Sequence, residues 1–127
     1  IFDEVIKESK VVTKQHTPDY CVNSYWGYAM ILNTDNPEFD WYKFRDLFQK
    51  NGGDGYYAAW KLTYQESLFT EEIQKMEGIT QEYSQGLCPN AEFLQKRIIA
   101  MKTNYWDLEE AKEQATILRK TLEEFQK

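Results

Sequence analysis

Residues 87–104 read LCPNAEFLQKRIIAMKTN, in which a helix-forming segment runs directly into a strand-forming one. Pro89 suits the first turn of a helix, where the N–H that proline lacks would have no partner within the helix. The apolar positions that follow share one helical face, namely Ala91, Leu94 and Ile98. Residues 99–103, which begin with three apolar positions, then predict a strand. A helix followed at once by a strand indicates an α/β domain.

Two further strands are predicted upstream. Residues 20–32 (YCVNSYWGYAMIL) are aromatic, apolar and free of charge, so we expect a strand, strongest at 25–32, that is covered on both faces. Residues 55–62 predict another strand. Residues 10–19 are polar and contain Pro18, which predicts an extended segment that crosses the domain.

A helix is predicted between these strands, after the turn cluster at 33–37 (NTDNP). Asp40 is suited to accept a hydrogen bond from the first free N–H groups of this helix. Its apolar face consists of Trp41, Phe44, Leu47 and Phe48. The pair Gly52-Gly53 predicts its end, because glycine adopts the left-handed conformation of a helix terminus at little cost.

The C-terminal segment gives the strongest helical pattern. Asp107 and Glu110 form an acidic version of a capping box, and Trp106 with Ala111 is expected to form a hydrophobic staple. One narrow apolar stripe follows, made by Leu108, Ala111, Ala115, Leu118, Leu122 and Phe125. The stripe favours packing on the domain's own sheet over a coiled-coil partner, because the helix is short for a coiled coil.

The remaining segments complete the predicted organisation. Residues 1–17 resemble the end of a truncated connecting helix with a linker, because nothing before Ile1 could cap the first turn. Residues 63–86 predict a long loop that contains a short helix, 70–76, begun by a threonine cap. Residues 18–127 are therefore predicted to form one α/β domain, with a small sheet of about three strands and helices packed mainly on one face.

Composition narrows the classes of function. The formal net charge is −6 and the isoelectric point is near 4.8, which argues against a nucleic-acid partner. No apolar run is long enough to predict a membrane span, and the N-terminal residues lack the apolar core of a signal peptide. Cys21 and Cys88 do not predict a disulfide framework. We expect two reduced thiols in a cytoplasmic protein.

Few residues predict local chemistry. His16 is the single histidine and lies in a polar linker, which favours an exposed side chain over a metal ligand or catalytic base. The glycine cluster at 52–55 follows a helix and precedes a strand, the reverse of a phosphate-binding loop. Residues 60–64 (WKLTY) bring two aromatic rings and an ammonium close together. They could line a pocket for a sugar and an anion or form an aromatic cluster at the core edge.

Four segments carry a resemblance to a known family. They are residues 23–32 (NSYWGYAMIL), 40–55 (DWYKFRDLFQKNGGDG), 56–69 (YYAAWKLTYQESLF) and 87–104. In order and spacing they resemble the C-terminal small domain of sugar aminotransferases of the DegT/DnrJ/StrS type. The resemblance extends from about residue 18 to the end of the chain.

The resemblance implies that the chain is a fragment of a larger enzyme. Such enzymes are dimers with the type I aminotransferase fold and depend on pyridoxal phosphate (PLP). Their N-terminal large domain carries the lysine that binds PLP and the acid that pairs with its ring nitrogen. They transfer an amino group from an amino acid to a nucleotide-linked keto sugar in amino-sugar and polysaccharide biosynthesis. No cofactor lysine segment is present here, so this fragment alone is expected to hold no cofactor and to be inactive.

The resemblance also implies substrate-side residues, for which we name Trp26, Trp60, Lys61 and Tyr64. The expected roles are stacking of a tryptophan on a sugar face, a hydrogen bond from the Tyr64 phenol, and pairing of Lys61 with a diphosphate. This sequence departs from the family at three of its positions. Relatives often place histidine where Trp26 and Tyr64 stand, and proline where Ser67 stands, which leaves the sugar specificity open.

Two other functions remain as hypotheses. The chain could be a stand-alone interaction module that binds a protein through its aromatic surface. It could also be a small enzyme in its own right, which is the least favoured hypothesis because no acid–base or nucleophile set converges. The size of the native protein distinguishes the detached domain from the module.

Overall fold

A computed structural model describes residues 1–36, 38–55 and 60–125. Its centre is a three-stranded antiparallel sheet with the strand order β1-β2-β3. The strands are β1 (Val12–Lys14), β2 (Tyr28–Leu32) and β3 (Ile98–Met101). In the register, Val12 lies opposite Leu32, and Met30 lies opposite Ile99. The predicted small α/β domain with about three strands is confirmed.

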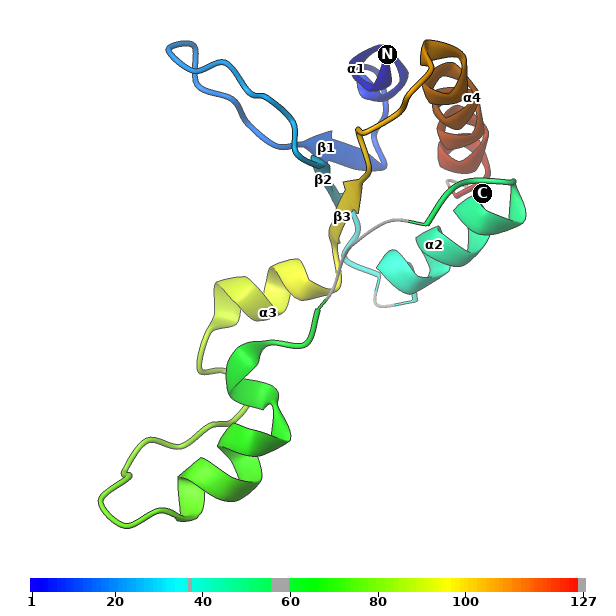
Figure 1. Ribbon diagram of the computed structural model, residues 1–127. Helices are drawn as coiled ribbons and strands as arrows, with labels where there is room; N and C mark the ends of the chain where they lie inside the picture. The colour runs from blue at the N-terminus through cyan, green and yellow to red at the C-terminus, as the bar shows by residue number, and fades with distance from the viewer. Residues whose placement is uncertain (37, 56–59, 126–127) are drawn as a thin grey trace.

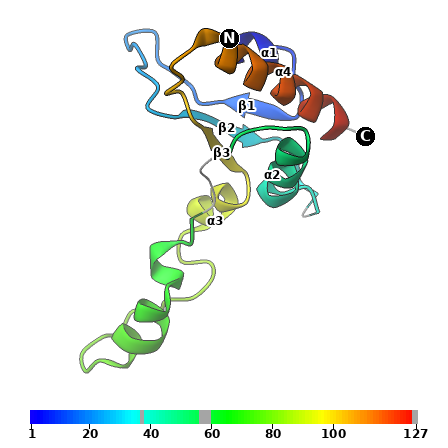
Figure 2. The same cartoon turned by 45° about the vertical axis from the view of Figure 1, so that its right-hand side comes forward.

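Three helices lie on the same side of this sheet (Figures 1 and 2). They are α1 (Phe2–Ile6), α2 (Trp41–Lys50) and α4 (Leu108–Phe125). Along β2, Tyr28, Met30 and Leu32 point to these helices and are buried, whereas Ala29 and Ile31 on the other face are only partly buried. The helices therefore cover mainly one face, as predicted, and the expectation that both faces are covered holds for one face only.

The core forms where the three helices meet the sheet. Its most deeply buried apolar side chains are Met30, Leu32, Phe44, Phe48, Ile99 and Leu118. Alternate residues of the strands and one stripe of each helix supply them, as the periods of 2 and 3.6 require. Burial of such side chains provides most of the driving force for folding.

The boundaries of α2 follow the prediction. The Lys43 N–H donates to the Asp40 carboxylate over 3.1 Å, so Asp40 caps the helix. Gly52 has a φ of +96°, the left-handed conformation that ends the helix. Gly53 lies against Phe48 so closely that a Cβ atom there would come within 2.3 Å of the ring. The two glycines thus have different roles, one conformational and one steric.

The start of α4 differs from the prediction. Asp107 caps the helix by accepting from the Glu109 N–H over 2.9 Å. Trp106 is fully exposed and Leu108 is 68% exposed, so the predicted Trp106–Ala111 staple is wrong. Tyr105, the residue before Trp106, packs against the core instead, so the chain enters α4 with Trp106 in solvent.

Two polar side chains are buried within the apolar stripe of α4. Gln114 Oε1 accepts from the Asp54 N–H over 2.8 Å. The Thr121 hydroxyl donates to the Ile117 carbonyl over 2.8 Å and accepts from Asn51 Nδ2 over 3.2 Å. These bonds fasten the turn after α2 to the middle of α4.

The strand predictions were partly wrong. Residues 10–19 contain β1, because Val11 and Val12 are buried and the segment pairs with β2. Of the strand predicted at 55–62, residues 56–59 lie outside the described residues, and Trp60 is not in a strand. The strand predicted at 99–103 is β3, shifted by one or two residues.

Residues 63–88, which we call the arm, extend away from the sheet and lead to α3 (Pro89–Gln95) (Figure 1). The arm contains three short helical turns, η1 (Thr63–Gln65), η2 (Leu68–Glu72) and η3 (Ile73–Lys75). Thr70 lies inside η2 and does not cap a helix, contrary to the prediction. Every residue from 60 to 98 is described, and none of them is buried.

Candidate functional site

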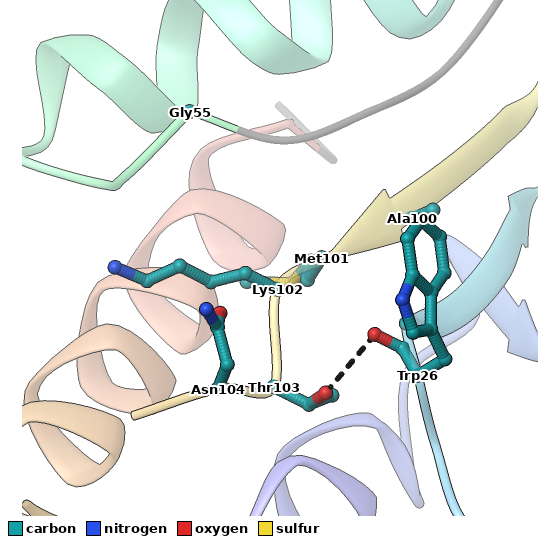
Figure 3. A pocket seen from close by; sticks show the side chains of 8 residues that line it. Trp26, Gly55, Ala100, Met101, Lys102, Thr103 and Asn104 are labelled. Atoms are coloured by element: carbon teal, nitrogen blue, oxygen red, sulfur yellow. Dashed lines mark hydrogen bonds between the residues drawn. The ribbon is translucent and has the colours of Figure 1, made fainter. Parts of the chain in front are cut away.

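A hollow of about 590 Å³ lies at the end of β3 (Figure 3). Its lining includes Trp26, Gly55, Ala100, Lys102, Thr103 and Asn104. The Trp26 ring stands on one side of the chain that leaves β3, and the Lys102 and Asn104 side chains point to the other side. The hollow is therefore bordered by an aromatic ring on one side and by a lysine and an asparagine on the other.

The turn before β2 presents Trp26 to this hollow. Tyr25 has a φ of +51°, and its N–H donates to the Asn23 side chain over 2.8 Å. The Thr103 hydroxyl lies 2.5 Å from the Tyr25 carbonyl oxygen and 3.2 Å from that of Trp26. The backbone of the turn is thus held on both sides, while the indole is 86% exposed. An exposed indole on a fixed backbone is a suitable platform for an apolar ring face.

The Lys102 ammonium, which borders the hollow, forms an ion pair with Asp54. Lys102 Nζ lies 2.6 Å from Asp54 Oδ2 and 4.7 Å from the centre of the Tyr105 ring. Burial of Tyr105, together with the Asp54 carboxylate, raises the pKa of its phenol to about 12. Gln114 holds the backbone of Asp54, so α4 fixes the position of this ion pair. The pair presents both a donor and an acceptor to a polar ligand.

The other three predicted residues lie at the base of the arm. The Trp60 carbonyl accepts from Gln95 Nε2 over 3.0 Å, and its indole is 73% exposed. Lys61 Nζ lies 3.5 Å from the Glu66 carboxylate. Tyr64 is half-buried, and its phenol donates to Glu92 Oε1.

The four predicted residues therefore form two groups. Trp26 comes just before Tyr28, the first residue of β2, and Tyr28 is paired with Met101, the last residue of β3. Trp26 therefore lies at the end of β3 marked by Met101. Trp60 contacts α3, which leads into the opposite end of β3 at Ile98. The structure brings Trp60, Lys61 and Tyr64 together and places Trp26 in a separate hollow.

Glu92 was missed in the sequence, although it organises the arm. Its Oε1 atom accepts from the Tyr64 phenol and, over 2.7 Å, from the Gly86 N–H. Both bonds lower the pKa of the Glu92 carboxyl. Burial and the bond to Glu92 raise the pKa of Tyr64 to about 12. A glutamate in the first turns of a predicted helix is usually explained by the helix dipole, so its sequence position gave no other signal.

Lys102 and Asn104 were also missed. Lys102 lies within the strand predicted at 99–103, and both residues follow the observed β3, which ends at Met101. Polar residues just beyond a strand commonly line a site. Only the pairing of β2 with β3 brings them next to Trp26. That pairing joins segments roughly seventy residues apart, which a local sequence pattern does not reveal.

Within the part of the chain that the structure describes, no group of His, Cys, Asp and Glu side chains could hold a metal ion. Cys21 and Cys88 are free and exposed, and His16 is exposed. No helix among the described residues is long and apolar enough to cross a membrane.

The described residues also do not fit PLP. Lys102 is the lysine that lines the hollow, and its side-chain nitrogen is engaged in an ion pair with Asp54 over 2.6 Å. Among the described residues that line the hollow, none belongs to a helix N-terminus that could bind a phosphate.

Comparison of the chain with known protein families, curated proteins and solved structures gave no match. The two groups of residues offer side chains that could contact a ligand, namely two exposed indoles, a phenol and two ammonium groups.

Proposed function

We propose that this chain is the C-terminal small domain of a PLP-dependent sugar aminotransferase of the DegT/DnrJ/StrS type. The unburied arm is the observation that carries this proposal, together with the four sequence segments. Its exposed apolar side chains, such as Leu68, Met76 and Ile79, form a surface that another protein body would have to cover. A domain that evolved within a larger dimeric enzyme would have such a surface.

In the proposed enzyme, the large domain binds PLP, which supplies the electron sink for amino transfer. This chain would supply one wall of the sugar pocket. Trp26 and Trp60 would stack on apolar sugar faces, and Tyr64 would donate a hydrogen bond. Lys61 would pair with the diphosphate of the nucleotide sugar. Homodimerisation would complete the site, and an enzyme of nucleotide sugars would act in the cytoplasm.

The first test uses the complete native protein and measures amino transfer from glutamate to a nucleotide-linked keto sugar. Trp26→Ala is expected to raise KM about tenfold, because a stacked ring contributes about 1 kcal/mol or somewhat more. Trp106→Ala is the matched control, since this tryptophan is also exposed but lies outside both groups. Equal effects of the two substitutions would contradict the assigned role of Trp26.

The second test concerns the isolated chain. Adding PLP should leave the absorbance spectrum equal to the sum of the separate components, with no transaminase turnover. A new PLP-dependent band or measurable turnover would refute the assignment as a domain without cofactor.

The exposed apolar arm would equally suit a stand-alone interaction module. The intact mass of the native protein separates the two functions. A parent much longer than this chain supports the aminotransferase domain, whereas a native protein of this size supports the interaction module.

A further inference from the structure

Three segments of the chain meet at a single carboxylate oxygen. Tyr64 lies in η1 where the arm begins, Gly86 lies where the arm returns, and Glu92 projects from α3. Glu92 Oε1 accepts hydrogen bonds from the Tyr64 phenol and from the Gly86 backbone N–H. The two donors stand at opposite ends of residues 65–85.

We propose that Glu92 is the residue that closes the arm and sets the direction of the Tyr64 side chain. Residues 65–85 contribute no buried side chain, so core packing does not hold the ends of this segment together. An ionised carboxylate accepts several hydrogen bonds, and bonds to an ionised acceptor are stronger than neutral ones. One Glu92 side chain can therefore hold both ends of the arm.

A second contact from α3 fixes the same region. Gln95 lies three positions after Glu92, on the same side of the helix, and its amide donates to the Trp60 carbonyl over 3.0 Å. α3 thus holds the chain both before η1 and within it. Together, Glu92 and Gln95 determine where the residues 60–64 are presented.

The hydrogen bond between Tyr64 and Glu92 should be detectable in the pKa of the Tyr64 phenol. The bond to Glu92 contributes to the raised pKa of the phenol, because a phenolate beside a carboxylate is disfavoured. Cys88 is the other titratable group beside Tyr64. Removing the Glu92 charge should therefore move the pKa of Tyr64 down from about 12 towards its ordinary value.

The test compares Glu92→Gln with Glu82→Gln in the isolated chain. Glu82 is an exposed glutamate of the same arm, and among the described residues its side chain shows no hydrogen bond like those of Glu92, so it is the matched control. Carbon-13 labelled tyrosine reports the pKa of Tyr64, and Tyr64→Phe identifies its resonance. Limited trypsin digestion at the exposed Lys75 reports opening of the arm.

Glu92→Gln should lower the pKa of Tyr64 and speed cleavage after Lys75 about fivefold or more, whereas Glu82→Gln should change neither. Tyr64→Phe keeps the Gly86 bond, so it should speed cleavage by a smaller factor. An unchanged Tyr64 pKa or an unchanged cleavage rate in Glu92→Gln would overturn the proposal.

The part of this inference that turns Tyr64 towards a sugar rests on the proposed function. In the complete enzyme, Glu92→Gln should raise KM for the sugar with little change in kcat. If the isolated chain shows the closure but KM stays constant, the substrate role of Tyr64 is wrong and the role of Glu92 in the arm stands.

Discussion

Asp3 is the residue that connects the N-terminal helix to two strands at once. Its Oδ2 atom lies 2.6 Å from Lys14 Nζ in β1, and its Oδ1 atom accepts from the Tyr28 phenol in β2 over 2.5 Å. The bonds from Lys14 and Tyr28 lower the pKa of Asp3. Burial and the bond to Asp3 raise the pKa of Tyr28. The separate bond between Lys14 and Asp3 raises the pKa of Lys14.

These shifts predict a loss of stability at both ends of the pH range. Because the pKa of Asp3 is lowered in the folded state, Asp3 stabilises the fold fully above its pKa in the unfolded chain, about 3.9. This stabilisation is lost as the pH falls through the lower pKa of the folded state. Because the pKa values of Tyr28 and Lys14 are raised in the folded state, these residues stabilise the fold fully below about pH 10. Their stabilisation is lost as the pH rises further.

Urea unfolding of the Asp3→Ala variant at several pH values measures how much Asp3 contributes to the free energy of unfolding. We expect a loss of about 1 kcal/mol at pH 7, because the buried Tyr28 phenol loses its acceptor while the ion pair itself is exposed. The difference from the parent chain should shrink towards pH 3. Asp46→Ala, which removes an exposed ion pair with Arg45, should have almost no effect. A pH-independent difference at Asp3 would contradict this account.

At the scale of the elements, α4 is fastened to the turn after α2 through Thr121. Thr121→Val keeps the shape of the side chain but removes the bond to Asn51 in a fully buried place. We expect the free energy of unfolding to fall by about 1 kcal/mol. Thr116→Val is the matched control, because Thr116 donates to the Lys112 carbonyl in the same way but is exposed. A similar loss for both variants would show that the bond to Asn51 contributes nothing.

Elements whose signals are local were predicted well. The Asp40 cap, the glycines after α2 and the stripe of α4 apart from Leu108 each depend on residues close in sequence, and these two helices begin and end close to the predicted positions. β1 was missed because three residues in a polar segment become a strand only by pairing with β2. Gln114 and Thr121 were outside the predicted stripe because their burial depends on partners 60 and 70 residues away, respectively.

The same limit applied to the candidate site. Residue types predicted Trp60, Lys61 and Tyr64 as possible ligand contacts, since aromatic residues often mark binding surfaces, and the family resemblance added Trp26. Their division into two groups follows from the sheet register, which the sequence pattern did not contain. Glu92 has an ordinary position in a helix, and only the return of the arm at Gly86 gives it a second donor.

At the scale of the whole molecule, the sheet with its three helices and the arm should differ in local stability. Amide hydrogens in the arm should exchange fast despite their hydrogen bonds, because no buried side chain protects them. Those of Met30, Ile99 and Leu118 should exchange only through global unfolding. Hydrogen exchange followed by mass spectrometry distinguishes the regions. Equal protection of the arm and the core would contradict this division.

The pairing of β2 with β3 also constrains how the chain folds. Met30 meets Ile99 only after a loop of roughly seventy residues has closed, so this step should dominate the time needed to reach the native state. The entropy of loop closure grows slowly with length, at about 0.6 kcal/mol for each doubling. Insertions or deletions in the arm would therefore change the folding rate only a few-fold. The chain can vary the length of its most exposed segment during evolution with little effect on how quickly its core assembles.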